Sequence, residues 1–179
     1  MNIQNELLSI IQDVPNFPKE GVIFKDINPL LRDPVAMKKV IAEMVGFARE
    51  LQVQNIVGIE SRGFFFGLPL ALQMNLPFIA ARKKGKLPGI VVNESYNLEY
   101  GSDSIEIQKS ALNIGERYLI VDDVIATGGT AKACSNIIEK SGAQVVGFSF
   151  LIELAFLRGR DLLQNSAYKF PIQSLINIT

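Results

Sequence analysis

The sequence predicts an α/β fold in which a parallel twisted sheet is flanked by helices. Segments with the spacing of amphipathic helices alternate along the chain with short apolar runs that are typical of strands. These runs are continuous rather than alternating in polarity, as expected where helices cover both faces of a sheet. The 179 residues suffice for one buried core, and no repeat or linker divides them, so we expect a single domain over 1–179.

The N-terminal third begins with a short, interrupted element. Residues 6–14 carry apolar side chains at helical spacing and predict a short amphipathic helix, which the segment PNFPKEG breaks. The following VIFKDINPLLRDP is expected to be extended or irregular. Asp33 and Pro34 then suit the N-cap and first position of a long helix that reaches about Gln52.

Strands and helices alternate through the rest of the chain. We expect strands at NIVGI, PFIAAR, YLIVDD, QVVGFSFLI and SLINI, and helices at 63–74, at 130–141 and in RGRDLLQ. Between the second and third of these strands, 91–108 predicts a β-hairpin or long flap, because a Gly-Ser-Asp turn separates two extended runs.

Composition excludes several classes of protein. The net charge is zero, so broad attraction to nucleic acid or to a membrane is not expected, and no apolar run could span a bilayer. The chain has no histidine, which excludes histidine-based nucleophile pairs and metal sites. The start, MNIQNELLSIIQDV, lacks the basic cluster of a targeting peptide. The single cysteine, Cys134, fits a cytoplasmic protein.

Four loops are expected at one edge of the sheet. Ligands of open parallel sheets bind beyond the carboxyl ends of the strands. The loops that follow the predicted strands in this direction are ESRGFFFG, RKKGKLPG, DDVIATGGT and ELAFLRGR.

The third of these loops has the most specific chemistry. Backbone amides of 126–130 can converge on a phosphate, since its glycines allow close approach and a helix N-terminus follows. Thr127 and Thr130 add hydroxyl donors. The TGGT segment alone is equally well explained as a capped turn, but Asp122 and Asp123 at the end of the preceding strand favour a ligand site.

Two further loops carry positive charge. The segment Ser61-Arg62-Gly63 offers amides and a guanidinium suited to diphosphate, although a surface arginine at a helix start is the simpler explanation when it is taken alone. Four cations crowd into 82–86. A solvated basic loop usually explains such a run. Its place beside two other anion loops in a neutral chain favours anion binding instead.

The segment VDDVIATGGT resembles the signature with which type I phosphoribosyltransferases bind phosphoribosyl diphosphate (PRPP). The resemblance implies that Asp122 and Asp123 accept hydrogen bonds from the ribose hydroxyls, and that a cis peptide joins Glu60 and Ser61. It assigns the 5′-phosphate to Ala126, Thr127, Gly128, Gly129 and Thr130. It assigns the diphosphate to Glu60, Ser61, Arg62, Gly63, Arg82, Lys83 and Lys86.

Six segments in order, between about Pro15 and Arg160, resemble the adenine-specific members of this family. They are GVIFKDINPLLRDP, ESRGFFFG, RKKGKLPG, SYNLEYG, EIQK and VDDVIATGGT. The resemblance implies that Phe24 stacks on the base and that the backbone of Ile23 and Lys25 reads its amino edge. A core position is the alternative for Phe24. Catalytic roles fall to Arg62 and to Glu99 and Tyr100 in the flap.

Ala126 supports the adenine assignment. Enzymes for hypoxanthine and guanine usually have an aspartate at this place, thought to handle the N7 proton, and alanine cannot do this. The expected reaction is adenine plus PRPP giving AMP plus diphosphate, with Mg²⁺ held mainly by PRPP oxygens and water. A phosphoribosyltransferase for another purine and a PRPP-binding regulator stay open as alternatives, although a regulator would need a DNA-binding module or a basic face.

The family resemblance also implies the arrangement around the base. A small hood is expected from about 1–33 with the C-terminal segment, and a flexible flap from about 91–108. A homodimer is implied by the resemblance alone. No nucleic-acid or membrane partner is expected, and the partners are the small-molecule substrates and products.

Overall fold

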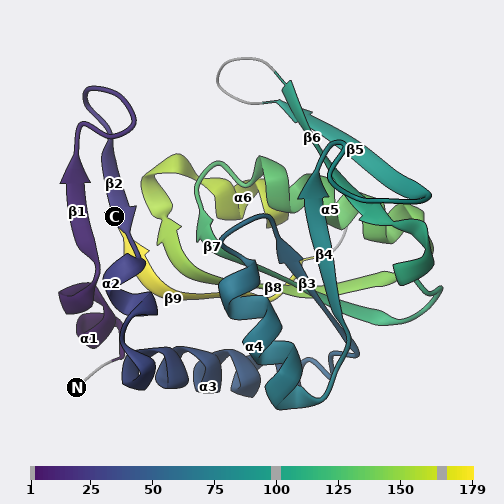
Figure 1. Ribbon diagram of the computed structural model, residues 1–179, viewed down its shortest axis with the longest axis horizontal. Helices are drawn as coiled ribbons and strands as arrows, with labels where there is room; N and C mark the ends of the chain where they lie inside the picture. Colours follow the sequence, from purple (N-terminus) through teal and green to yellow (C-terminus); the bar gives the residue numbers. More distant parts are fainter. Residues whose placement is uncertain (1–2, 98–101, 165–168) are drawn as a thin grey trace.

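The computed structural model in Figure 1 describes residues 3–97, 102–164 and 169–179. Its main sheet has seven strands in the order β5-β6-β4-β3-β7-β8-β9. Neighbours from β4 to β9 are parallel, whereas β5 and β6 form an antiparallel hairpin beside β4. The strands are β3 (Asn55–Ile59), β4 (Phe78–Lys83), β5 (Val91–Asn97), β6 (Ser102–Gln108), β7 (Arg117–Ile125), β8 (Gln144–Leu154) and β9 (Ile172–Ile178). The predicted α/β fold and the hairpin are confirmed.

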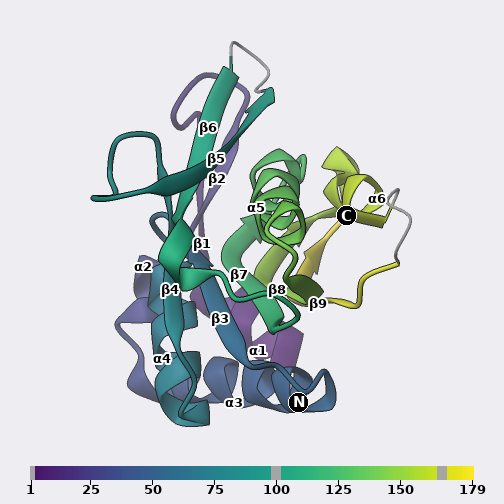
Figure 2. The same ribbon diagram turned by 90° about the vertical axis from the view of Figure 1, so that its right-hand side faces the viewer.

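Helices cover both faces of this sheet (Figure 2). On one face lie α3 (Pro34–Glu50) and α4 (Phe64–Met74), and on the other lie α5 (Gly129–Lys140) and α6 (Gly159–Gln164). The remaining helices are α1 (Ile3–Ile10), α2 (Asn28–Leu31) and the short 3₁₀ turns Lys109–Ala111 and Ala155–Leu157.

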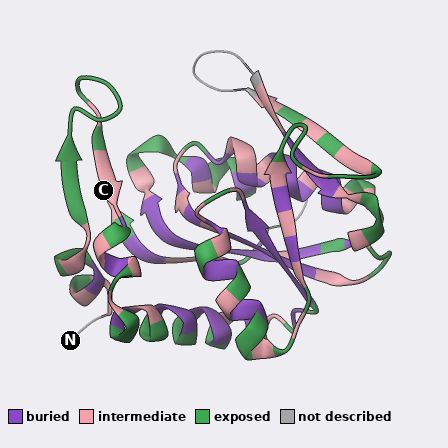
Figure 3. Cartoon of the chain, viewed as in Figure 1, coloured by how far each residue is buried: buried purple, intermediate pink, exposed green. Residues whose placement is uncertain are grey.

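The two faces of the sheet have separate cores. In β7, Leu119 and Val121 pack into the core on the α3 and α4 side, and Tyr118 and Ile120 pack into the core on the α5 side. Successive side chains of a strand point to opposite faces. Both faces of β7 are therefore buried (Figure 3), which explains why its sequence is continuously apolar up to Asp122.

Helix α3 starts as the sequence predicts. One carboxylate oxygen of Asp33 accepts hydrogen bonds from the amides of Val35 at 2.9 Å and Ala36 at 3.0 Å, and Pro34 occupies the first helical position. This cap satisfies amides that a helix start otherwise leaves unpaired.

The predicted first helix is wrong beyond Ile10. Val14 belongs instead to β1 (Gln12–Pro15), which pairs antiparallel with β2 (Ile23–Asp26), so that Val14 lies opposite Phe24. Pairing between strands overrides the local helical spacing. The following segment, expected to be extended or irregular, is extended in β2 but helical in α2. In Figure 1 the β1–β2 hairpin rises on the left and the β5–β6 hairpin on the right, both beyond the same edge of the sheet.

Candidate active site

The carboxyl ends of β3, β4, β7 and β8 lie at one edge of the sheet, because these strands run parallel. The four loops that the sequence assigned to one edge are therefore neighbours. We call this the carboxyl edge, and the opposite end of the same strands the amino edge.

Arg62 joins three parts of the site. Its Nε lies 2.8 Å from Oδ2 of Asp123, at the end of β7, and its guanidinium carbon lies 5.1 Å from the centre of the Phe24 ring. Asp123 is only 3% exposed. Burial raises the pKa of Asp123, and the charge of Arg62 opposes this rise. The pair brings residues from β2, from the loop after β3 and from β7 within contact of one guanidinium.

Asp122 faces the other side of β7. It borders a cavity of about 90 Å³ whose remaining lining comes mostly from the loop after β7, namely Val124, Ile125, Ala126, Thr127, Gly128, Gly129, Thr130, Ala131 and Phe150. This small cavity lies at the start of α5, where backbone amides and the helix dipole favour an anion. Burial and the charge of Asp123 raise the pKa of Asp122 well above its usual range.

The loop after β3 is tied to the loop after β4. The Glu60 carboxylate accepts two hydrogen bonds from Arg82, at 3.0 and 3.2 Å, and one from the amide of Lys83 at 3.0 Å. The bond from Arg82 lowers the pKa of Glu60. The Glu60–Ser61 peptide is cis, which confirms that prediction. Glu60 thus orients cations and cannot itself attract a diphosphate.

Strand β6 contacts the loop after β4. Asp103 lies 3.3 Å from the ammonium of Lys83, and the Tyr96 hydroxyl contacts Asp103 at 3.4 Å. On β5, Glu94 accepts hydrogen bonds from Asn136 and Lys140 of α5, at 3.1 and 2.6 Å. The hairpin is therefore attached both to the loop after β4, which contains the basic residues 82–86, and to α5, which follows the loop 126–130. We call the loop 126–130 the phosphate loop, after the role that the sequence predicts for it. Glu99 and Tyr100, the predicted catalytic residues of the flap, lie outside the described residues.

Phe24 is a surface residue rather than a core residue. It is half-buried, belongs to neither core, and packs edge-on against Phe17 with ring centres 5.2 Å apart. Its neighbours on β2 are exposed Ile23 and half-buried Lys25, whose ammonium pairs with Asp13 at 2.6 Å. An aromatic ring held at the surface beside Arg62 is available to a planar ligand.

The structure brings most of the predicted site residues to the carboxyl edge. Ser61 and Gly63 flank Arg62, and the carbonyl of Lys86 accepts a hydrogen bond from Arg82 at 3.1 Å. The sequence did not reveal that Gly159, at the start of α6, approaches the loop 126–130, or that Glu153, near the end of β8, binds the neighbouring Arg160. Only the placement of ELAFLRGR at this edge pointed toward them.

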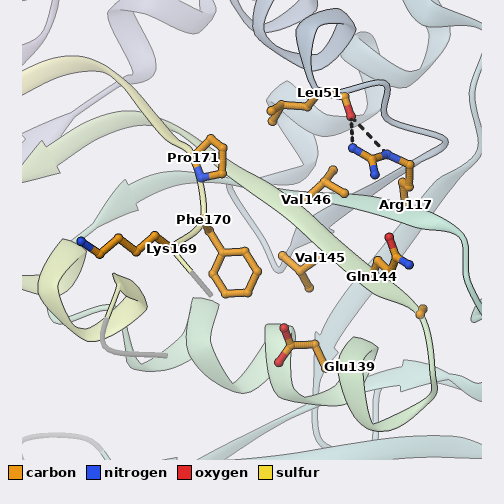
Figure 4. A pocket seen from close by; sticks show the side chains of 10 residues that line it. Leu51, Arg117, Glu139, Gln144, Val145, Val146, Lys169, Phe170 and Pro171 are labelled. Atoms are coloured by element: carbon orange, nitrogen blue, oxygen red, sulfur yellow. Dashed lines mark hydrogen bonds between the residues drawn. The ribbon is translucent and has the colours of Figure 1, made fainter. Parts of the chain in front are cut away.

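A larger cavity, of about 730 Å³, lies at the amino edge (Figure 4). It is lined by Leu51, Arg117, Glu139, Ala143, Gln144, Val145, Val146, Lys169, Phe170 and Pro171. Arg117 donates hydrogen bonds to the Leu51 carbonyl at 2.8 and 3.3 Å, and Lys169 lies on the opposite side of the cavity (Figure 4). Its cations do not converge on one point, so the cavity offers no anion site.

A model of the phosphoribosyl transferase domain family matches residues 33–177. The adenine phosphoribosyltransferase of Synechococcus sp. (strain JA-3-3Ab) is 52% identical over 159 residues, which cover 88% of this chain and 91% of that protein.

Solved structures agree with this. Adenine phosphoribosyltransferase from Rhodothermus marinus DSM 4252 superposes with a TM-score of 0.91 at 44% identity, covering 98% of each chain. The Saccharomyces cerevisiae enzyme, solved with an imino-altritol bisphosphate and adenine, gives a TM-score of 0.89 at 40% identity, covering 97% of this chain and 98% of that one. Within the described residues, none of the helices has the length and apolar character needed to cross a membrane.

Proposed function

The chain belongs to the phosphoribosyltransferase family and, within it, to the adenine phosphoribosyltransferases, and from this premise we propose how its carboxyl-edge site works. The reaction joins adenine to the anomeric carbon of PRPP, releases diphosphate and yields AMP. The chain is thus an enzyme of the pentosyltransferase class.

The position of Arg62 carries the proposal. A single guanidinium that contacts both the Phe24 ring and the Asp123 carboxylate lies where base, sugar and diphosphate must meet. The ion pair is made through Nε, and the Nη groups are the donors that we assign to diphosphate oxygens. Phe24 stacks on adenine, and the backbone of Ile23 and Lys25 reads its amino edge.

The sugar phosphate lies along the end of β7 and the loop that follows. Asp122 and Asp123 accept hydrogen bonds from the ribose hydroxyls, since ionised carboxylates are acceptors only. The amides of 126–130 and the hydroxyls of Thr127 and Thr130 hold the 5′-phosphate, and the cavity of about 90 Å³ beside them suits a group of this size.

The leaving group meets a second set of charges. Displacement at the anomeric carbon builds positive charge on the ribose ring and negative charge on the diphosphate, and preplaced charges stabilise this separation. Arg82, Lys83 and Lys86 face the diphosphate, with Arg82 oriented by Glu60. The buried acid pair lies beside the ring. The β5–β6 flap, with Glu99 and Tyr100, closes over the reacting atoms and excludes water.

Mg²⁺ enters with the substrate. Among the described residues, no group of three acids, cysteines or histidines is arranged to hold a metal. Asp123 already pairs with Arg62, so PRPP oxygens and water supply most of the ligands. When bound, the ion neutralises charge on the diphosphate.

We place the enzyme in the cytoplasm as a homodimer. Exposed Phe65, Leu68 and Leu72 follow one another at helical spacing on α4, and they support burial against a second copy. The only cysteine is buried, as suits a reducing compartment. Sedimentation analysis tests the dimer, and a monomer at micromolar concentration would contradict it.

The decisive experiment is an ultraviolet assay of base consumption with PRPP and Mg²⁺. We expect AMP to form from adenine, and much slower turnover of hypoxanthine and guanine under the same conditions. Equal use of a 6-oxopurine would favour a phosphoribosyltransferase for another base. Binding of PRPP without turnover of any purine would favour a regulator.

A further inference from the structure

The back of the phosphate loop is in contact with the start of α6. Gly159 is buried, and a Cβ atom added to it would lie 2.2 Å from the carbonyl oxygen of Ala126 and 2.9 Å from the amide nitrogen of Gly128. In the opposite direction, a Cβ added to Gly128 would lie 2.7 Å from the carbonyl oxygen of Gly159. The two backbones are closer than any side chain would allow.

The two glycines are needed for different reasons. Gly128 has a φ of +81°, which residues with side chains rarely adopt. Gly159 is not among the residues with positive φ, so its backbone conformation is also open to residues with side chains. Close approach to the loop is therefore the reason for glycine at position 159.

Buried contacts fix the helix that carries Gly159. Arg160 donates hydrogen bonds to both carboxylate oxygens of Glu153, to the Ile172 carbonyl at 3.1 Å and to the Ser174 hydroxyl at 3.2 Å. Glu153 is 5% exposed, and Leu163 on the same helix is fully buried. The start of α6 is thus joined to β8 and β9, and it cannot move away if the contact with the loop becomes too tight.

We propose that Gly159 is a positioning residue for the 5′-phosphate, and that the Glu153–Arg160 pair holds it against the back of the phosphate loop. This inference depends on the proposed function, because it assumes that the loop binds the phosphate of PRPP. A side chain at position 159 would push the Ala126 carbonyl and the Gly128 amide, and so would turn the loop amides away from the phosphate. Misplacement by about 1 Å can cost on the order of a hundredfold in a site of this kind.

Gly159→Ala in the full chain tests the proposal, with Gly46→Ala as the matched control. Gly46 lies in α3, and a Cβ there meets nothing within 4 Å.

Two measurements are made on each variant: steady-state kinetics with PRPP and adenine, and calorimetric titration with ribose 5-phosphate. For Gly159→Ala we expect the KM for PRPP and the Kd for ribose 5-phosphate to rise by about tenfold or more. We expect kcat and the KM for adenine to change by less than about threefold, since Phe24 lies on β2 away from this contact. Gly46→Ala should match the wild type.

A ribose 5-phosphate affinity within about twofold of the wild type in Gly159→Ala would overturn the proposal, as would equal increases in the KM for PRPP and the KM for adenine.

If Gly159→Ala does not fold, Arg160→Lys serves instead, because it keeps the charge but loses the forked contact with Glu153. Arg160→Lys should raise the KM for PRPP more than the KM for adenine. An unchanged KM for PRPP would contradict the role of the Glu153–Arg160 pair. Failure of the wild type to form AMP would refute the proposed function alone, since the ribose 5-phosphate titration needs no turnover.

Discussion

The carboxyl and amino edges of the sheet differ in how their charged side chains are arranged, and the sizes of their cavities do not reveal this difference. The amino edge holds a cavity of about 730 Å³, whereas the cavity in the phosphate loop at the carboxyl edge measures about 90 Å³. At the amino edge, Arg117 is used to cap carbonyls of Leu51 and Gln52. At the carboxyl edge, Arg62 and Arg82 pair with acids, and Lys83 of the same basic loop pairs with Asp103. Converging charges, rather than volume, therefore locate the active site.

Removing the charge of Asp123 should have the largest effect on activity. Asp123→Asn takes away the charge of the buried partner of Arg62 and the proposed acceptor for the ribose, so we expect kcat/KM for PRPP to fall by about a hundredfold or more with little change in fold. Glu139→Gln makes the same chemical change at the amino edge and should leave kcat/KM unaltered. Steady-state kinetics with circular dichroism compares the two, and near-normal turnover of Asp123→Asn would argue against the ribose role.

The two arginines should separate activity from stability. Arg62→Ala should raise the KM for PRPP by about tenfold to a hundredfold and more than the KM for adenine, because a charged donor to the diphosphate is lost. Arg117→Ala should instead lower the melting temperature and leave both KM values unchanged, since its guanidinium donates hydrogen bonds to carbonyls at the amino edge. Equal effects of Arg62→Ala on both substrates would contradict the diphosphate assignment.

Replacing one aromatic residue at each edge tests which edge binds the base. Phe24→Ala should raise the KM for adenine by about tenfold, which corresponds to the loss of one stacking contact, with little effect on PRPP. Phe170→Leu, at the larger cavity, should lower thermal stability without changing either KM, because Phe170 packs against Phe148 in the core. An unchanged adenine KM in Phe24→Ala would remove Phe24 from the base site.

The smallest effect concerns stability and pH. Because the folded state raises the pKa of Asp122 above the usual 3.8, the folded protein binds this proton more tightly than the unfolded chain. The free energy of unfolding should therefore fall as the pH rises from about 3.8 through the raised pKa. Asp122→Asn should flatten this dependence and raise the melting temperature at pH 7 by a few degrees. Calorimetry of both proteins from about pH 4 to about pH 8 isolates the contribution of Asp122, and a stability difference between Asp122→Asn and the wild type that does not grow with pH would contradict the assignment.

The sequence predicted the fold where local and tertiary preferences agree. Continuous apolar strands such as β7 and the Asp33 cap both depend on preferences that act over short distances along the chain. The predicted Gly-Ser-Asp turn was misplaced, because Ser102 and Asp103 belong to β6 and Gly101 lies outside the described residues. The prediction was wrong at Val14, where pairing with Phe24 decides the structure. Pairing between distant strands leaves little trace in the local spacing of apolar residues.

For the candidate site, too, the sequence predicted only the features that local patterns contain. Residues within one motif, such as Asp122 and the loop 126–130, were identified together. The contacts that join motifs could not be, because they depend on where separate strands end in space. The Arg62–Phe24 contact and the close approach of Gly159 to Ala126 are of this kind. The sequence gives no sign that position 159 requires glycine until α6 is placed against the loop.

The most direct test of the difference between the two edges is a titration of the isotopically labelled protein with ribose 5-phosphate, followed by backbone amide chemical shifts. Ribose 5-phosphate carries neither a purine nor a diphosphate, so it reports on the proposed ribose and phosphate sites without the base. The account predicts that the largest shifts fall on the amides of 126–130 and on Gly159 behind them. Largest shifts at 144–146 or at Phe170, beside the larger cavity, would contradict it.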